Sequence, residues 1–163
     1  MLLALVIIHT ALSLIAIAFG IVVLADLLRG RDSGRVAALF LATAVLTSAT
    51  GFLFPFTQLL PSHVTAIVAL LVLALTIPAR YRFGLTGLWR GVYAGGSVAS
   101  LFLLVFVLIA QTFAKVPALR ALAPTQTEPP FAVTQIVALA IFIILGLLAV
   151  RRFHPTATVS AAG

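Results

Sequence analysis

Apolar residues run along this chain in five long stretches, and polar residues collect in the short segments between them. A helix needs roughly 20 residues to cross the hydrocarbon core of a bilayer, and each stretch is close to or above that length. The pattern predicts membrane-spanning helices at about residues 2–28, 36–54, 62–78, 91–113 and 131–150. The expected fold is therefore all-α, a polytopic transmembrane five-helix bundle forming one domain over residues 1–152.

Composition supports a membrane protein and excludes a soluble globule. The chain is 63% hydrophobic and 8% charged, whereas soluble domains carry roughly 25% charged residues. Its net charge of +7 comes from basic residues placed beside the apolar stretches, which is typical of topology signals and of contacts with lipid head groups. We therefore expect the lipid bilayer as a partner and no nucleic acid. The absence of cysteine excludes disulfides and thiolate chemistry.

The distribution of basic residues predicts how the bundle lies in the membrane. Two of the turns and the tail hold eight arginines, which are Arg29, Arg31, Arg35, Arg80, Arg82, Arg90, Arg151 and Arg152. The other side holds only Lys115 and Arg120. Because cytoplasmic loops are enriched in basic residues, this bias places the N-terminus outside and the C-terminus, with a short tail at 153–163, in the cytoplasm.

The longest polar segment is the predicted outer loop at 114–130. It contains the only Lys, the only Glu and four of the eight prolines. Residues 117–123 favour a short helix with proline at its first position. The segment after it, up to Pro130, is expected to be extended because residues before proline avoid the helical region.

Polar residues within the spans fall mostly in the outer half, and all five helices contribute to them. Such residues are costly in hydrocarbon unless they face protein or water. We therefore predict an outward-facing polar pocket that the loop covers. Its candidate ligand-binding residues are His9, Thr43, Thr47, Thr50, His63, Gln111, Lys115, Arg120, Glu128 and Gln135. The alternative is that each Thr bonds back to its own helix while each Gln and His caps a helix or reaches the interface.

Small residues on the fourth span favour close helix packing. Gly91 and Gly95 are four residues apart, as are Gly96 and Ser100, and this spacing lets helix backbones approach closely. The contact is expected inside one chain, with a homo-oligomer or a larger membrane complex as the alternative.

The chemistry of the spans excludes several classes of protein. There is no carboxylate, Lys or Arg at mid-membrane depth, which argues against a proton-coupled pump. His9 and His63 lie near the outer surface on different spans, so a haem b with two axial histidines is an alternative cofactor. No catalytic residues or other metal ligands are identified.

Two segments, Thr47-Ser-Ala-Thr-Gly-Phe-Leu-Phe-Pro-Phe56 and residues 115–131, resemble a group of small bacterial inner-membrane proteins to which no activity is assigned. The resemblance implies a multi-pass protein of the bacterial cytoplasmic membrane and carries over no functional residues.

Three functions are consistent with these residues. The first is a non-enzymatic binding or permeation module for a small polar solute, an ion or a lipid head group. The second is a haem- or quinone-linked redox subunit that uses His9 and His63. The third is an accessory subunit whose outer loop docks another membrane complex.

Overall fold

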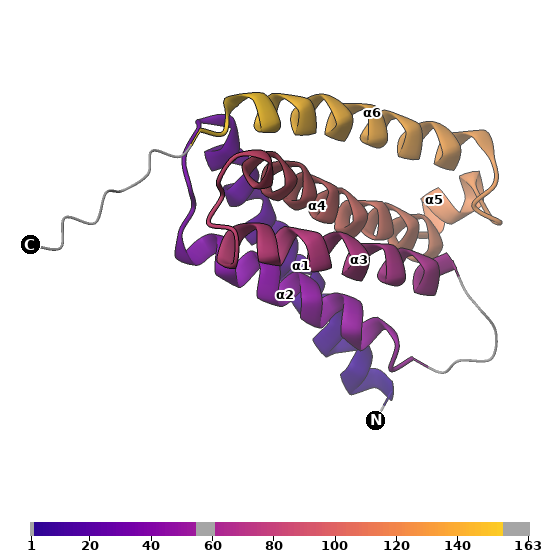
Figure 1. The fold of residues 1–163 in the computed structure, drawn as a ribbon. Coiled ribbons are helices and arrows are strands. Elements are labelled where there is room, and N and C mark those ends of the chain that lie inside the picture. Colours follow the sequence, from indigo (N-terminus) through magenta and orange to yellow (C-terminus); the bar gives the residue numbers. More distant parts are fainter. Residues whose placement is uncertain (1, 55–60, 155–163) are drawn as a thin grey trace, which may run out of the picture.

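The computed structural model describes residues 2–54 and 61–154. Within these ranges the chain is all α-helical, which confirms the predicted class, and contains no strand. The helices are α1 (Leu2–Leu28), α2 (Arg35–Gly51), α3 (Pro61–Tyr81), α4 (Leu88–Lys115), α5 (Pro117–Leu122) and α6 (Pro129–Arg152). The five longer helices run alternately between two ends of a bundle (Figure 1). We call the end with the arginine-bearing turns the arginine end and the opposite end, which carries α5, the loop end.

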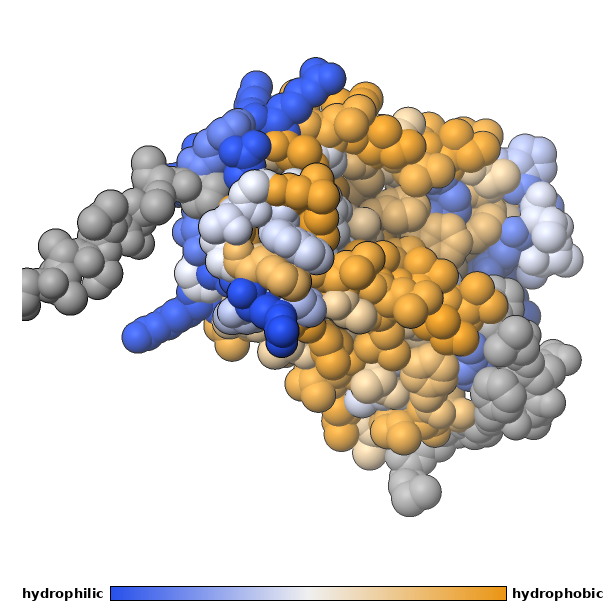
Figure 2. All heavy atoms as spheres, viewed as in Figure 1, coloured by the Kyte–Doolittle hydropathy of each residue, from blue (hydrophilic) through white to orange (hydrophobic). Residues whose placement is uncertain are grey.

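Four of these helices are long and apolar enough to cross a membrane. They are α1, α3, α4 and α6, whereas α2 is a shorter apolar helix of 17 residues. Figure 2 shows apolar atoms covering the middle of the visible face and hydrophilic atoms gathered at its left, which is the arginine end. These features are those of a multi-pass integral membrane protein.

Several helix ends differ from the sequence prediction by two or three residues, including the start of α4 at Leu88 rather than at residue 91. The third helix was expected to stop near Pro78, but α3 continues to Tyr81. Pro78 removes one backbone donor, yet its own carbonyl accepts bonds from the N–H groups of Arg82 and Phe83, at 2.9 and 3.0 Å. Helix α2 ends at Gly51, three residues before the predicted limit, because Phe52 and Leu53 turn back onto Ala49 and Thr50. Pro55, which directly follows the predicted end of this span at residue 54, lies outside the described residues.

The structure of the loop agrees with the sequence prediction at α5 and differs from it just before α6. The short helix α5 starts at Pro117, as predicted. Pro129 and Pro130, however, are not part of an extended segment, because they form the first turn of α6. Proline suits that position since its φ is already helical and the missing N–H has no partner in a first turn.

Helix α4 is the centre of the bundle and contacts each of the other described helices. Two glycines allow the closest approaches. A Cβ on Gly20 of α1 would lie 2.7 Å from Leu101 of α4 and 2.8 Å from Phe40 of α2. A Cβ on Gly96 would collide with the Thr76 hydroxyl on α3. These close helix contacts bury the core residues Phe40, Leu73 and Leu101 fully or almost fully.

The arginine end is closed by an ion pair over aromatic rings. Arg80 donates two hydrogen bonds to the Asp32 carboxylate, at 2.5 and 3.0 Å. Its guanidinium lies 5.3 Å from the centroid of the Tyr93 ring, and the Tyr93 and Phe153 rings are 5.6 Å apart. Both of these rings are fully buried. This contact joins the α1–α2 turn, α3, α4 and the residue after α6.

Candidate functional site

A cavity of about 590 Å³ lies in the loop-end half of the bundle, between α1, α2, α3 and α4. It forms because the N-terminal half of α1 and the C-terminal half of α2 lean away from α4 (Figure 1). Most of its wall is apolar, including Val6, Leu14, Ile17, Leu73 and Val107. Polar side chains from all four helices also line it, which are His9, Thr10, Ser13, Thr47, Ser48, His63, Thr65, Ser100, Gln111, Thr112 and Lys115.

His9 reaches the cavity from α1 and is held against the end of α2. Its Nδ1 is 2.9 Å from the Thr50 hydroxyl, and its ring meets the Phe54 ring edge-on at 5.3 Å. Gly51 lies beside the ring, and a Cβ there would meet the imidazole Cε1 at 3.8 Å, an ordinary contact distance. The cross-helix bond therefore fixes the ring at the cavity wall and leaves Nε2 as its second polar atom.

His63 approaches the same cavity from the first turn of α3. Its side chain is 2% exposed, and its ring lies 6.0 Å from the Phe52 ring. The two histidines named as alternative haem ligands thus line one cavity from separate helices.

Gln111 and Lys115 form the part of the cavity nearest the loop end. They lie four residues apart on α4, so they share a face of that helix, and both are exposed. Lys115 is the last residue of α4, where a cation is favoured by the negative end of the helix dipole. This end of the cavity therefore presents an amide and a positive charge together.

Two hydroxyls of the cavity wall are buried without a hydrogen-bond partner among the described residues. Thr47 is 6% exposed and Ser100 is 3% exposed. Ser48, which also lines the cavity, instead donates to the Ala44 carbonyl at 2.9 Å. A buried hydroxyl without a partner is unfavourable, so Thr47 and Ser100 are the wall positions best suited to bonding a guest.

Five predicted site residues do not line the cavity. The Thr43 hydroxyl donates to the Leu39 carbonyl of its own helix at 2.7 Å, as the alternative interpretation expects. Arg120 is exposed on α5. Gln135 is buried between α6 and α4, where its Nε2 donates to the Phe106 carbonyl at 3.1 Å. Thr50 does not line the wall itself, but its hydroxyl holds His9, which does.

The fifth residue outside the cavity, Glu128, organises the loop. Its carboxylate accepts bonds from the Thr125 N–H, the Thr125 hydroxyl and the Thr127 N–H, at 3.1, 2.8 and 3.1 Å. It occupies the N-cap position of α6 but makes no side-chain cap bond. Desolvation is the largest single influence and raises the pKa of Glu128, but the hydrogen bonds from Thr125 and Thr127 together outweigh it and keep that pKa below its usual value.

Sequence reasoning missed Gln126 as a structural residue of the loop. Its side-chain amide donates to the Ala110 carbonyl of α4 at 2.7 Å, and its backbone has a φ of 60°. A non-glycine residue in this left-handed region is uncommon. Gln126 therefore ties the loop back to α4, and no local sequence pattern indicates a left-handed Gln.

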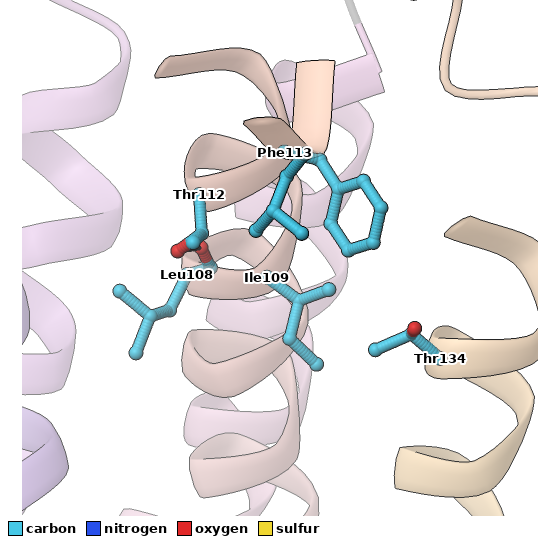
Figure 3. Close-up of a pocket in the computed structure, with 6 residues that line it drawn as sticks. Leu108, Ile109, Thr112, Phe113 and Thr134 are labelled. Carbon is cyan, nitrogen blue, oxygen red and sulfur yellow. Dashed lines mark hydrogen bonds between the residues drawn. The ribbon is translucent and has the colours of Figure 1, made fainter. Parts of the chain in front are cut away.

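A second, smaller cleft of about 400 Å³ lies between α4, α5 and α6. Figure 3 shows Ile109 and Phe113 on α4 pointing toward Thr134 on α6. The Thr112 and Thr134 hydroxyls bond to carbonyls of their own helices, both at 2.7 Å. This cleft offers hydrocarbon and satisfied hydroxyls, so it lacks the polar groups that distinguish the larger cavity.

The small residues of α4 face two different helices of the same chain. A Cβ on Gly91 or Gly95 would meet Val150 of α6 at 3.6 or 3.5 Å, an ordinary contact distance. Gly96 faces Thr76 of α3 far more closely, and Ser100 lines the cavity. The small-residue spacing thus brings α6 and α3 onto opposite sides of α4.

Comparison with protein-family models, with curated proteins and with solved structures found no match for this chain. The class of protein therefore follows from the helices and the cavity alone, and it is a multi-pass membrane protein.

Proposed function

We propose that this chain is a membrane-embedded binding module whose cavity accepts an amphiphile with an anionic head group. The cavity wall is mostly apolar, and its polar groups include Gln111 and Lys115 at the loop end. From Ser100 to Lys115 the α4 wall rises by 15 residue steps, or roughly 22 Å at 1.5 Å per step. A hydrocarbon chain lies against such a wall, while its head group meets the amide and the ammonium.

The sequence allows a small polar solute, an ion or a lipid head group as the ligand. Of these three, the cavity favours the lipid head group. Ligand sites bury most of the ligand against apolar walls and orient it with a few polar groups. A free ion or a sugar would leave most of this wall without a suitable partner. An amphiphile places its hydrocarbon chain against the apolar wall and its head group beside Gln111 and Lys115. This match between the ligand and the cavity is the observation that supports the proposal.

The proposed topology places the cavity toward the outside. Five spans, with α2 as the fifth, put the arginine end in the cytoplasm and the loop end on the outer side. The arginine bias supports this orientation. A reporter fused after Gly163 tests it: activity of a cytoplasmic reporter is expected, and activity of an extracytoplasmic reporter would contradict it.

The binding proposal is tested by thermal unfolding in a mild detergent with added lipid. Phosphatidylglycerol, which is anionic, is expected to raise Tm, whereas phosphatidylcholine is not, because only a ligand that binds the folded state stabilises it. Lys115→Met should abolish most of the gain. Arg120→Met is the matched control, since it removes a loop-end cation that does not line the cavity, and it should keep the gain.

Two outcomes would contradict the proposal. Equal stabilisation by both lipids would remove the role of the anionic head group. Equal loss in Lys115→Met and Arg120→Met would point to charge at the membrane surface rather than to the cavity. Mass spectrometry of lipid retained through purification gives an independent measure, with less retained lipid expected for Gln111→Leu.

A redox function is the second candidate, because His9 and His63 line the same cavity. The histidines would be the axial ligands of a haem b, which supplies one-electron chemistry. A Soret band in the purified protein that is lost in His63→Ala would support this candidate, and a colourless preparation would end it. Docking of another membrane complex through the loop, homo-oligomerisation and a bacterial cytoplasmic membrane location stay predictions.

A further inference from the structure

A row of buried hydroxyl groups extends from the cavity along one face of α4. The row consists of Ser100, Ser97 and Tyr93, which are 3%, 2% and 0% exposed. Their spacing of three and four residues places them on one helix face, over roughly 10 Å of helix. None of the three hydroxyls has a hydrogen-bond partner within the part of the chain that the structure describes.

The two ends of this row connect different regions of the bundle. At one end Ser100 lines the cavity, as does Thr47, whose hydroxyl is also buried and unpartnered. At the other end the Tyr93 ring lies 5.3 Å from the guanidinium of Arg80, and the Tyr93 hydroxyl is without a partner among the described residues. Arg80 is in turn bonded to Asp32. The row therefore leads from the cavity to the ion pair at the arginine end.

Neighbouring hydroxyls show that this arrangement is not the ordinary one for a helix. Ser and Thr within a helix commonly donate to the carbonyl one turn earlier. Ser48 and Thr76 do so, with distances of 2.9 and 2.8 Å to the carbonyls of Ala44 and Val72. The hydroxyls of the row do not, although each lies in the interior, where an unsatisfied polar group is unfavourable. Bound water with two to four polar partners satisfies such groups.

We propose that the cavity continues as a file of bound water along Ser100, Ser97 and Tyr93, and that this file carries protons between the cavity and the arginine end. Each hydroxyl or water accepts a proton from one neighbour as it passes its own proton to the next. No covalent bond to carbon changes, and no group is oxidised or reduced. The amphiphile is not required, so this function goes beyond the binding of a lipid.

Bound water beside Tyr93 is tested by X-ray radiolytic labelling of the purified protein. Hydroxyl radicals formed from a bound water modify side chains next to it even when bulk solvent has no access. Tyr93 is therefore expected to be modified although it is fully buried, whereas Phe40, an equally buried ring, stays unmodified. Tyr81, which is 60% exposed, is the positive control. Protection of Tyr93 to the level of Phe40 would overturn the proposal.

Proton movement is tested in phosphatidylcholine vesicles that enclose a pH-sensitive dye, with a valinomycin-clamped potassium gradient as driving force. Vesicles with the wild-type protein should acidify several-fold faster than protein-free vesicles. Ser97→Val should reduce this rate to near the protein-free value. Thr43→Val removes a hydroxyl that bonds to its own helix outside the cavity, and its rate should equal that of the wild type.

Either of two results in this assay would overturn the proposal, namely a wild-type rate equal to that of protein-free vesicles or a Ser97→Val rate equal to the wild-type rate. Circular dichroism and gel filtration of each variant before reconstitution confirm that a lost rate is not a lost fold, and Ser97→Ala replaces Ser97→Val if the larger side chain prevents folding. Neither result affects the lipid test at Lys115, because these vesicles contain no anionic lipid.

Discussion

The two ends of the bundle use the same four helices in opposite ways. At the arginine end, α1 to α4 converge on buried residues such as Leu27 and Tyr93, and the charged groups Arg80 and Asp32 pair with each other. At the loop end the helices separate around a cavity in which Thr47 and Ser100 have no partner among the described residues. Pairing of the buried charge favours stability at the arginine end, and unpartnered polar groups on the cavity wall favour binding at the loop end. We therefore expect mutations at the two ends to separate these properties.

The largest expected effect comes from closing the gap between α3 and α4. In Gly96→Ala the new Cβ would collide with Thr76, which is fully buried. Overpacking of this kind typically costs about 1–3 kcal/mol, and a shift of two central helices places this site at the upper end of that range. Denaturant unfolding in detergent measures it. Gly95→Ala is the neighbouring control, whose Cβ would meet Val150 at 3.5 Å, and equal losses in both variants would contradict this expectation.

The next effect tests whether pairing of charge holds the arginine end together. Asp32→Asn removes the negative charge and one of the two oxygens that accept from Arg80, and the Arg80 side chain is only 11% exposed. Hydrogen bonds to charged groups contribute about 1.5–3 kcal/mol, and the 34% exposure of the Asp32 side chain reduces the expected loss to about 1–2 kcal/mol. Asp26→Asn, whose partner Arg31 is 66% exposed, should lose less than about 1 kcal/mol. A reversed order would mean that the Arg80 pair is solvated.

A smaller effect is expected at the cavity wall. Thr50→Val removes the bond that holds His9 against α2, and a neutral hydrogen bond contributes about 0.5–1.5 kcal/mol. The imidazole should become mobile, which NMR of labelled histidine detects as a broadened signal. Thr43→Val alters the same helix without touching His9. An unchanged His9 signal in Thr50→Val would show that Phe54 and Gly51 alone position the ring.

The smallest effect concerns pH and the loop. The lowered pKa of Glu128 means that its carboxylate stabilises the loop above the unfolded pKa, and that this stabilisation is lost as pH falls through the lowered folded value. Hydrogen exchange of the Thr125 and Thr127 amides should therefore show extra opening in acid after correction for the intrinsic rate. Glu128→Gln should show the open behaviour at neutral pH.

The sequence predicted the helices well because hydrocarbon imposes one requirement on every span. Only continuous helices satisfy the backbone there, so apolar length alone located α1, α3, α4 and α6. The ends of these helices were less predictable. Pro78 lies inside α3 because its carbonyl still accepts two bonds, and that depends on the turn that follows it.

The wall of the cavity was only partly predictable. The depth of a polar residue can be read from the sequence, and this placed His9 and Gln111 at the same level. Which side of a helix faces a gap depends on how neighbouring helices tilt. Gln135 lies on a helix that docks on another side of α4, and Glu128 is turned into the loop by Thr125. The unpartnered hydroxyl of Ser100 was visible only once its surroundings were known, and the sequence had presented Ser100 as a packing residue.

The position of α6 has a consequence for how the molecule is assembled. Helix α6 buries only Gln135 and Ala149 and touches the bundle mainly along α4, with some contact to α1. A ribosome delivers α6 after the other four long helices, which already contact one another. Newly inserted protein therefore passes through a stage in which the Gly91–Gly95 face of α4 is still coated by lipid tails. Until the last helix arrives and displaces them, that face is open to any chaperone or neighbouring nascent helix.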